Sequence, residues 1–365
     1  MKFKSERDIL VEALSAASRV VATRLIGASS GILLSLTGNQ LTVTGTDLDI
    51  TVRTTVDVIG LEDGSVVVPA RLVVDAVRSL EAGAVTIAGN DENVEVSLGR
   101  AKFSLRTFQV MDYPKLPPVT GAVTSIPALD LVQGLNQVVR AAANDDARPL
   151  LTGVLFTTED NKLRLIATDS YRLAVRDVPE VNGVGDHDLL VPARALQEFQ
   201  RAAASLASDA EVGITLTDAE ICFVVGTTSI ASRLIDGNYP SVLQLIPASY
   251  PNQLRIAKDT LLTSLKRAKL LAKDSTSSVR LTMKDKGVEI RTQSHDTGDV
   301  EDNVDADYTG EEITIAFNPG FLIDGIEAVP GDEIILEMSD SVRPAMVHGV
   351  EDTRFRYLLM PVRVQ

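Results

Sequence analysis

The sequence contains little of the material from which disulfides, metal sites and nucleophilic catalysts are built. Its 365 residues include one cysteine, three histidines and no tryptophan. The lone Cys222 excludes an internal disulfide and a cysteine-based zinc site, and its strand-like surroundings, 220–225, favour a small buried side chain over a nucleophile. His187, His295 and His348 have no partner at metal-ligand spacing. We therefore expect neither a metal nor a cofactor.

Long apolar runs are missing as well. No stretch approaches the roughly 18–20 apolar residues that span a bilayer, and the charged residues 1–8 lack an apolar signal core. A cytoplasmic protein without membrane contact is expected, in a reducing compartment that suits the single cysteine. The net charge of −15 excludes a protein that coats nucleic acid with its entire surface, but it allows a local positive surface.

The sequence does contain an internal repeat. Three short landmarks recur in the same order, with steps of 121 to 126 residues. They are Val-Pro-Ala-Arg at 68–71 and 191–194 with Phe-Asn-Pro at 317–319, Thr-Asp at 46–47 and 168–169, and Tyr-Pro at 113–114 and 239–240 with Met-Pro at 360–361. Their joint order predicts three copies of one unit of about 120 residues.

Each copy opens with a helical pattern of apolar residues and carries a second one after the Val-Pro-Ala-Arg landmark or its counterpart. The six expected helical spans are 6–24, 71–82, 129–148, 193–209, 258–273 and 318–328. Alternating strands rich in Val, Ile and Thr lie between them, as in antiparallel sheets with one buried face. The predicted fold class is α+β, with three tandem copies of a helix–sheet–helix–sheet domain. Turn formers at 115–121 and 247–252 place the domains at 1–121, 122–248 and 249–365.

Motifs for catalysis are missing. The sequence has no nucleophile elbow, no GxxxxGK[ST] loop and no HExxH pair, and the acidic loop 143–149 lacks the ligand spacing of a calcium loop. Asp47 and Asp169 could form a carboxylate pair for acid–base catalysis. Because they stand at equivalent places in two copies, a shared turn-forming role is the better interpretation. We expect no enzyme activity, and a hydrolase that uses these two aspartates is a rival hypothesis.

Charge is distributed unevenly between the expected elements. The six helical spans carry net charges of 0, 0, −1, 0, +4 and −2, a total of +1, so the rest of the chain carries −16. A surface made of helices could therefore be neutral to basic, whereas a surface made of strands would repel phosphate. The sharpest local case is the run Lys266, Arg267, Lys269 and Lys273, which a solvated helix face would also explain.

Particular segments resemble a known family. The threefold unit, TDSYRLAVR at 168–176, YPSVLQLIP at 239–247 and MPVRV at 360–364 are similar to the bacterial DNA polymerase III beta subunit, the sliding clamp family, over essentially the whole chain. The resemblance implies a head-to-tail homodimer that forms a six-domain ring, with helices inside and sheets outside. It also implies a processivity factor that encircles double-stranded DNA without reading its sequence and without catalysis.

The resemblance further implies DNA contacts and partners. The residues at matching positions for phosphate contact are Arg24, Arg71, Arg78, Arg148, Arg194 and Lys273. Pro149 and Leu150 stand where many members carry aromatic residues. The implied partners are the replicative DNA polymerase subunit, the clamp loader, and other proteins of repair and replication that carry a clamp-binding motif.

A partner-peptide groove is implied between the second and third domains. Its matching residues are Leu151, Thr168, Ser170, Tyr171, Arg172, Leu173, Pro240, Gln244, Leu245, Leu358, Met360, Pro361, Val362 and Arg363. Apolar and Met side chains rimmed by Arg and Thr suit an extended peptide with one or two apolar anchors. Ser170, Tyr171 and Gln244 replace the glycine, histidine and arginine of many members. Without the resemblance, residues 360–362 read as a terminal strand of the third core.

The implied dimer seam joins the first domain to the third domain of the other chain. Phe103 and Leu105 on a strand would face Leu270 and Leu271 on a helix. Arg100 and Lys102 would face an acidic cluster, which comprises Asp296, Asp299, Glu301 and Asp302. Strand edges that meet there would protect two exposed edges. The alternative function is a repeat-built peptide-binding scaffold that does not encircle DNA.

Overall fold

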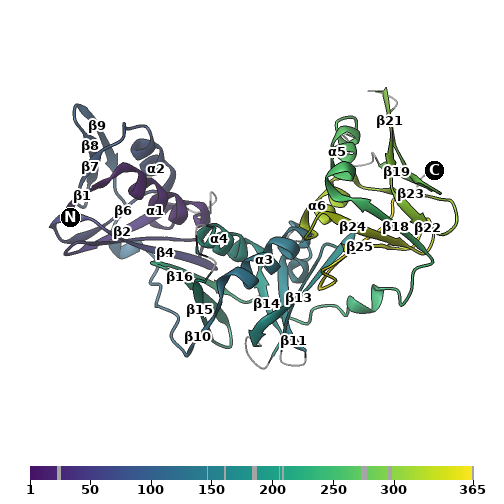
Figure 1. The fold of residues 1–365 in the computed structure, drawn as a ribbon. Helices are drawn as coiled ribbons and strands as arrows, with labels where there is room; N and C mark the ends of the chain where they lie inside the picture. Colours follow the sequence, from purple (N-terminus) through teal and green to yellow (C-terminus); the bar gives the residue numbers. More distant parts are fainter. Residues whose placement is uncertain are drawn as a thin grey trace. The chain divides into compact units, whose positions relative to one another are not determined.

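The computed structural model describes residues 1–22, 26–145, 147–159, 162–182, 187–204, 206–207, 209–272, 278–294 and 298–363. The chain divides into two compact units, which are treated separately here (Figure 1). The first unit combines Met1–Ala128 with Arg194–Leu234, and the second combines Leu129–Ala193 with Ile235–Gln365. The middle third of the chain thus contributes to both units.

The elements follow one order in each third of the chain. The first third contains β1 (Lys2–Glu6), α1 (Arg7–Val20), β2 (Gly31–Thr37), β3 (Gln40–Thr46), β4 (Ile50–Asp57), β5 (Ile59–Glu62), β6 (Gly64–Pro69), α2 (Ala70–Arg78), β7 (Ala84–Gly89), β8 (Asn93–Leu98) and β9 (Ala101–Arg106). The second contains β10 (Val123–Pro127), α3 (Ala128–Val138), β11 (Gly153–Glu159), β12 (Lys162–Thr168), β13 (Arg172–Asn182), β14 (Leu189–Pro192), α4 (Ala193–Ala203), β15 (Glu211–Leu216), β16 (Glu220–Val225) and β17 (Thr228–Arg233). The third contains β18 (Asn252–Ala257), α5 (Lys258–Lys269), β19 (Val279–Lys284), β20 (Gly287–Ser294), β21 (Gly298–Asp305), β22 (Asp307–Thr309), β23 (Ile313–Phe317), α6 (Pro319–Ala328), β24 (Glu333–Met338), β25 (Ala345–Gly349) and β26 (Phe355–Leu359).

The repeat predicted from the sequence is confirmed by this order. The landmarks at 68–71, 191–194 and 317–319 each join a strand to the second helix of their copy. Prolines suit this place because the first turn of a helix needs no amide donor. In the third copy Asn318 caps α6 by accepting a hydrogen bond from the amide of Phe321 at 3.1 Å. The α+β class and the helix–sheet–helix–sheet unit are therefore correct.

Sheets from neighbouring copies join edge to edge. In the first unit β17 pairs antiparallel with β4, which makes an eight-stranded sheet in the order β10-β15-β16-β17-β4-β3-β2-β6. In the second unit β26 pairs with β13 in the same way, within the nine-stranded sheet β14-β11-β12-β13-β26-β25-β24-β18-β22. At both junctions the last strand of one copy pairs with the third strand after the first helix of the copy before it.

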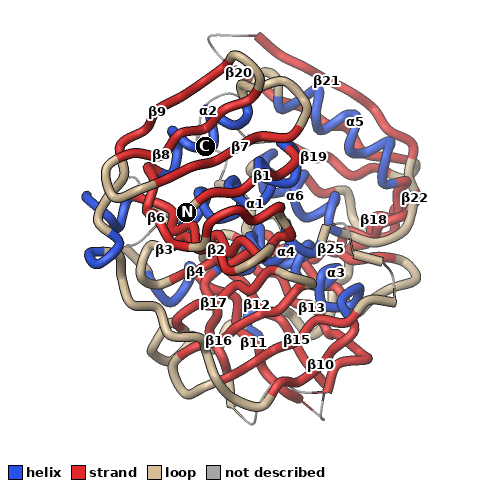
Figure 2. The backbone as a smooth tube through the Cα atoms, turned by 90° about the vertical axis from the view of Figure 1, so that its left-hand side faces the viewer, coloured by secondary structure: helices blue, strands red, loops and turns tan. Residues whose placement is uncertain are grey.

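Two of the strands at sheet ends are β9 and β21. The five-stranded sheet β5-β1-β7-β8-β9 ends on β9, where Figure 2 shows β7, β8 and β9 in sequence. The four-stranded sheet β21-β20-β19-β23 ends on β21. Within the described residues each of these two strands pairs along one edge only.

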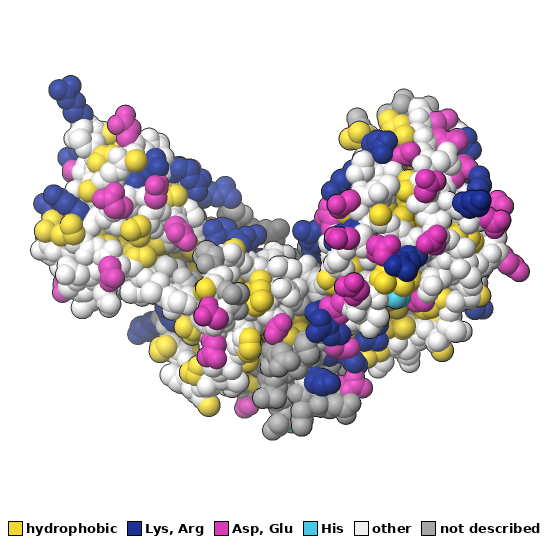
Figure 3. Space-filling view, viewed as in Figure 1, with side chains coloured by type: hydrophobic (Ala, Val, Ile, Leu, Met, Phe, Trp, Pro, Cys, Tyr) yellow, Lys and Arg dark blue, Asp and Glu magenta, His cyan; other side chains and the backbone are white. Residues whose placement is uncertain are grey.

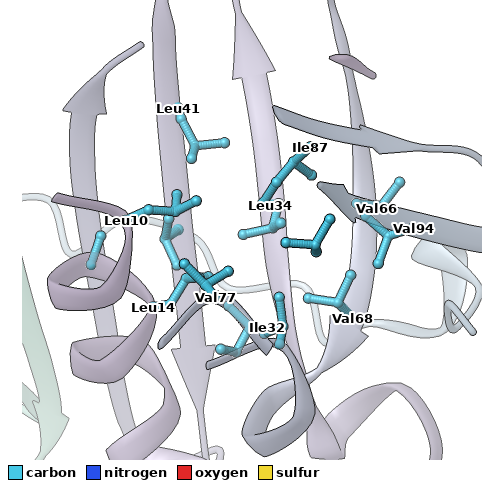
Figure 4. Packing of buried hydrophobic residues seen from close by; sticks show 14 of the residues in the cluster. Leu10, Leu14, Ile32, Leu34, Leu41, Val66, Val68, Val77, Ile87 and Val94 are labelled. Carbon is cyan, nitrogen blue, oxygen red and sulfur yellow. The ribbon is translucent and has the colours of Figure 1, made fainter. Parts of the chain in front are cut away.

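A large core of buried residues lies in the first unit, between the helices and the sheets. α1 presents Leu10 and Leu14 at helical spacing, and they meet Ile32 and Leu34 of β2 and Val77 of α2 (Figure 4). β6, β7 and β8 add further valine and isoleucine side chains from alternate positions. This burial of apolar area is the main stabilising contribution, at about 25 cal/mol per Å². Cys222 is buried in β16 as expected, and burial raises the pKa of its thiol.

The helices of each unit form a layer against its sheets. In the first unit α1 packs on α2 and reaches α4 through an ion pair between Arg19 and Glu198. In the second unit α5 packs on α6, and Gln137 of α3 donates a hydrogen bond to the Ala328 carbonyl at the end of α6 at 2.9 Å. None of the described helices is long and apolar enough to cross a membrane.

Candidate functional site

Two matching turns carry the Thr-Asp landmarks. In the first, Thr46 Oγ1 donates to the Ile50 carbonyl at 2.9 Å, and Asp47 Oδ1 accepts from the Ile50 amide at 2.7 Å. The residue after Asp47, Leu48, has a φ of +83°. A backbone in this left-handed region is costly for a residue with a side chain, so the hydrogen bonds of the turn must hold it there.

The second turn repeats these contacts. Thr168 Oγ1 donates to the Arg172 carbonyl at 2.5 Å, Asp169 Oδ1 accepts from the Arg172 amide at 3.0 Å, and Ser170 has a φ of +76°. Both aspartates therefore form turns, which supports the interpretation that these residues are structural. Each also binds an arginine through Oδ2, namely Arg194 for Asp47 at 2.8 Å and Arg172 for Asp169 at 3.0 Å.

Asp47→Asn should leave this turn in place, because the amide oxygen of Asn can still accept the backbone hydrogen bonds. We expect less than about 1 kcal/mol of lost stability, from the half-exposed ion pair to Arg194. Asp47→Ala removes the acceptor and should cost about 1–2 kcal/mol. Urea unfolding of both variants measures the difference. If the function of the protein were lost in Asp47→Asn while its stability stayed unchanged, the structural role would be contradicted and the catalytic rival revived.

The second turn borders an apolar cluster. Leu173 of β13 and Leu358 of β26 meet Met346 of β25, Val242 and Ile166 in its interior. Val242 comes from YPSVLQLIP, and the strand residues come from the joined sheets. The cluster thus unites two of the segments on which the family resemblance rests, 168–176 and 239–247.

The residues predicted for a peptide groove divide into two groups. Five are buried and support the surface, namely Leu151, Thr168, Arg172, Leu173 and Leu358. The others reach the surface fully or in part, namely Ser170, Tyr171, Pro240, Gln244, Leu245, Met360, Pro361, Val362 and Arg363. Three large apolar side chains stand out among them, because Tyr171, Leu245 and Met360 are 59%, 53% and 42% exposed. Exposed apolar side chains around a cluster are typical of a binding surface.

Backbone hydrogen bonds fix the C-terminal segment beside the turn. The Met360 amide donates to the Tyr171 carbonyl at 2.9 Å, and the Val362 amide donates to the Ala316 carbonyl at 2.8 Å. The segment 360–362 is therefore not a further strand of the third core, which ends with β26 at Leu359. It lies beside the turn that contains Tyr171 and exposes Met360.

Arg172 has a different environment from the one that a groove rim implies. Its guanidinium is buried, lies 2.6 Å from Asp324 Oδ2, and stacks 4.3 Å above the Phe321 ring. Tyr171 stacks on the same ring at a centroid distance of 6.3 Å. Arg172 is therefore buried beneath the edge of the groove and is not part of its exposed surface. Phe321, whose ring packs against both Arg172 and Tyr171, is a further residue of this site that the sequence did not indicate.

Other members of this cluster were also missed. Leu150, Tyr239 and Tyr250 pack against it as partly buried residues. Burial raises the pKa of the Tyr250 hydroxyl to about 12, with a further contribution from the charge of Glu337, and burial likewise raises the pKa of Tyr239. Both hydroxyls stay protonated at neutral pH and can donate hydrogen bonds.

The structure describes four of the six predicted phosphate-binding residues. Arg71 and Arg78 are exposed on α2, and Arg78 Nη2 donates to Ser15 Oγ at 3.1 Å. Arg194 binds Asp47, and Arg148 Nη1 donates to Ser170 Oγ at 2.8 Å, so a predicted DNA contact touches the predicted groove rim. Arg24 and Lys273 lie outside the described residues.

The histidines and other potential metal ligands can be located in the described part of the chain. No group of three or more His, Cys, Asp or Glu side chains there could hold a metal ion. His348 lies in β25, with Nε2 at 3.5 Å from Glu337, and His187 is exposed. His295 lies outside the described residues.

The chain consists of three copies of one domain that join through their sheets. An exposed apolar surface lies beside a turn whose hydrogen bonds recur in two of the copies. These features define a binding protein that is built from repeats. Family comparisons match the DNA polymerase III beta subunit in three consecutive parts, the N-terminal domain at 1–117, the central domain at 125–241 and the C-terminal domain at 243–363. The beta sliding clamp of Streptomyces coelicolor is 32% identical over the full length of both chains, and that of Bacillus subtilis is 30% identical over the full length of both. The chain belongs to the beta sliding clamp family, whose members are non-catalytic processivity factors of DNA polymerase III.

Solved structures show the same likeness. The sliding clamp of Bartonella birtlesii, solved with bound griselimycin, superposes with a TM-score of 0.91 at 28% identity, covering 100% of both chains. The clamp of Bacillus subtilis superposes with a TM-score of 0.88 at 29% identity and the same coverage. The predicted family and the three tandem clamp domains are thus confirmed.

Proposed function

We propose that this protein closes as a head-to-tail homodimer around duplex DNA and tethers the replicative polymerase to its template. The observation that carries the proposal is the repeated sheet junction. β17 with β4 and β26 with β13 use one pairing rule, and the rule leaves β9 of the first copy and β21 of the third at sheet ends. If β9 pairs with β21 of a second chain, the last strand of the first copy again pairs with the third strand after the first helix of another copy. In a twofold dimer this pairing occurs twice, so both free strands of each chain are paired and the six domains close into a ring.

The proposed seam residues support this closure. Phe103 and Leu105 are half-buried on β9, and Leu270 is 70% exposed beyond α5, next to Leu271. Leu270 stands twelve residues after the start of α5, where the first two copies place Arg19 and Arg140 at their junctions. An apolar residue at this position suits an interface between chains, because its burial does not require a charged side chain to lose its hydration.

The charged residues of the seam are partly engaged within the chain. Lys102 pairs with Glu95 at 2.5 Å, Glu301 with Arg291 at 3.1 Å and Asp302 with Arg267 at 3.3 Å. Arg100 and Asp299 are exposed, and Asp296 lies outside the described residues. We propose that these charges set orientation more than affinity.

The domain boundaries 1–121, 122–248 and 249–365 are part of this proposal. The family matches at 1–117, 125–241 and 243–363 support it to within a few residues. The second domain lies across both compact units, because its two sheets join different neighbours.

The tether would be the apolar surface around Tyr171, Leu245 and Met360. An extended peptide from the polymerase subunit, the clamp loader or a repair protein would place its apolar anchors there. Affinity of about micromolar strength suffices, because DNA held in the ring raises the effective concentration of the tethered enzyme. DNA itself would meet the helical layers, where Arg24, Arg71, Arg78, Arg148, Arg194 and Lys273 are the proposed phosphate contacts.

Retention on closed DNA tests the ring directly. After loading, the protein should stay on nicked circular DNA through gel filtration at moderate salt and should leave once a restriction enzyme linearises the circle. A topological link predicts this difference because the contacts themselves are weak and sequence-independent. Equal loss from circular and linear DNA, with peptide binding intact, would favour a peptide scaffold that does not encircle DNA.

A further inference from the structure

Both helical layers contain a carboxylate that contacts two cations, at least one of which comes from a neighbouring helix. In the first unit Glu198 of α4 lies with Oε2 at 2.8 Å from Arg19 Nε of α1 and accepts a second hydrogen bond from Arg201. The Glu198 side chain is only 8% exposed, whereas the two arginines are 38% and 50% exposed. Two surface cations are thus held by one covered acid.

The second unit repeats this arrangement on α6. Glu327 lies with Oε1 at 2.9 Å from Lys266 Nζ of α5 and with Oε2 at 3.2 Å from Arg140 Nη1, which follows α3. The hydrogen bond from Lys266, aided by Arg140, lowers the pKa of Glu327, so this carboxylate stays ionised at neutral pH. Asp324, one turn earlier, lies 3.8 Å from Arg140 and 2.6 Å from Arg172.

The arrangement follows the repeat. Arg19 and Arg140 each stand twelve residues after the first residue of α1 and α3, and Glu198 and Asp324 each stand five residues after the first residue of α4 and α6. The same helix positions therefore supply the cation and the acid at both junctions between copies. This recurrence separates the pairs from chance contacts of long surface side chains.

We propose that Glu198, Asp324 and Glu327 hold these cations in ion pairs and thereby limit how many of them bind DNA phosphate at one time. The inference rests on the proposed function, since it assumes that the helical layers face DNA. Affinity for DNA follows the number of phosphates that cations neutralise. A phosphate can attract Lys266 or Arg140 only by drawing it away from Glu327, and the exposed carboxylate then repels the phosphate. Contacts of this kind form and break easily, as a ring that slides along DNA requires.

The mixed charge of the surface agrees with this view. On the face that Figure 3 shows, acidic and basic side chains are interleaved. On α5 itself, Lys266 and Arg267 have acidic partners, whereas Lys269 forms no ion pair with the described residues. The helix therefore carries a restrained lysine and an unrestrained one three residues apart.

Glu327→Gln tests the proposal in the full-length protein. Equilibrium binding to a fluorescent DNA duplex, followed by anisotropy over a series of salt concentrations, should show about three- to tenfold tighter binding at low salt. The slope of log K against log salt should steepen by about 1 to 2, because Lys266 and Arg140 become available. Glu198→Gln in the other unit should act in the same direction and guards against a folding defect of one variant.

Matched variants separate the possible outcomes. Glu333→Gln removes the same charge from a pair with Arg255 between β18 and β24 and should change the slope little. Lys266→Gln should weaken DNA binding less than Lys269→Gln does. The inference would be wrong if Glu327→Gln and Glu198→Gln changed the DNA affinity and its salt slope as little as Glu333→Gln does. It would also be wrong if the two lysine variants lost equal affinity. The carboxylates would then only stabilise the packing of the helices. Absence of salt-dependent DNA binding by the unmodified protein would instead contradict the proposed function.

Discussion

Replacing Arg172 by methionine is expected to destabilise the second unit by about 3–5 kcal/mol and to abolish peptide binding. The guanidinium is 7% exposed and lies between Asp169 at 3.0 Å and Asp324 at 2.6 Å. Methionine fills much of the volume but leaves the two acids without their shared cation. Removing one partner of a buried pair is costly because the remaining charge has lost its hydration and its counterion.

The effect should reach the binding surface because Arg172 lies under its rim. Arg172 is also the last residue of the turn that positions Tyr171. The Met360 amide donates a hydrogen bond to the Tyr171 carbonyl. Loss of the buried pair should therefore release the turn and the C-terminal segment together. Urea unfolding and anisotropy with a labelled clamp-binding peptide measure the two consequences.

Arg255→Met provides a matched control. This residue forms one ion pair with Glu333, and both side chains are about half exposed. Such a pair contributes less than about 1 kcal/mol. A comparable loss of stability in both variants, or normal peptide affinity in Arg172→Met, would show that Arg172 does not support the surface.

Arg172 also shows how far sequence reasoning reaches. Its place in TDSYRLAVR marks it as part of the candidate site, and the turn formed by Thr168 and Asp169 is local enough to be predicted from repeat equivalence. Its burial depends on Asp324 and Phe321, which lie about 150 residues further along the chain. Spacing within a segment contains no information about such partners, so the residue was assigned to the rim instead of to the support below it.

Helix ends illustrate the same limit. The helical pattern at 129–148 predicts one long helix, whereas α3 ends at Val138 and is followed by a 3-10 turn at Val139–Ala141. No glycine or proline marks this end. The chain leaves the helix where the Ala143 amide donates to the Leu151 carbonyl at 2.8 Å, a tertiary contact that competes with further helical hydrogen bonds. The copies themselves were predictable because three landmarks with one order constrain a fold more strongly than local propensity does.

The seam between chains should be the most sensitive interface of the protein. Leu270→Ala combined with Leu271→Ala is expected to raise the dimer dissociation constant roughly a thousandfold. Each truncation of a leucine buried at an interface costs about 1 kcal/mol or more, and a closed dimer contains two seams and hence four such residues. The expected total of about 4 kcal/mol would convert the protein to monomers at micromolar concentration. Sedimentation velocity over a dilution series measures this change.

The repeat explains why these leucines should matter. At the junctions within the chain, the position of Leu270 is occupied by Arg19 and Arg140, which pair with Glu198 and Asp324. The first copy carries Asp75 at the acidic position and an exposed Leu72 nearby on α2. In a closed ring α2 of one chain would face α5 of the other, and the exposed leucines of both helices would lose their contact with water together.

A control variant separates the seam from surface hydrophobicity in general. Leu129 of α3 is 44% exposed and lies away from β9 and β21 along the chain, so Leu129→Ala should leave the dimer unchanged. The double leucine variant should keep its peptide affinity, because the surface around Tyr171 and Met360 uses other residues. It should lose retention on nicked circular DNA, since a monomer has no closed ring. An intact dimer in the double variant would show that the sheet-pairing rule does not extend from the two junctions within the chain to the one between chains.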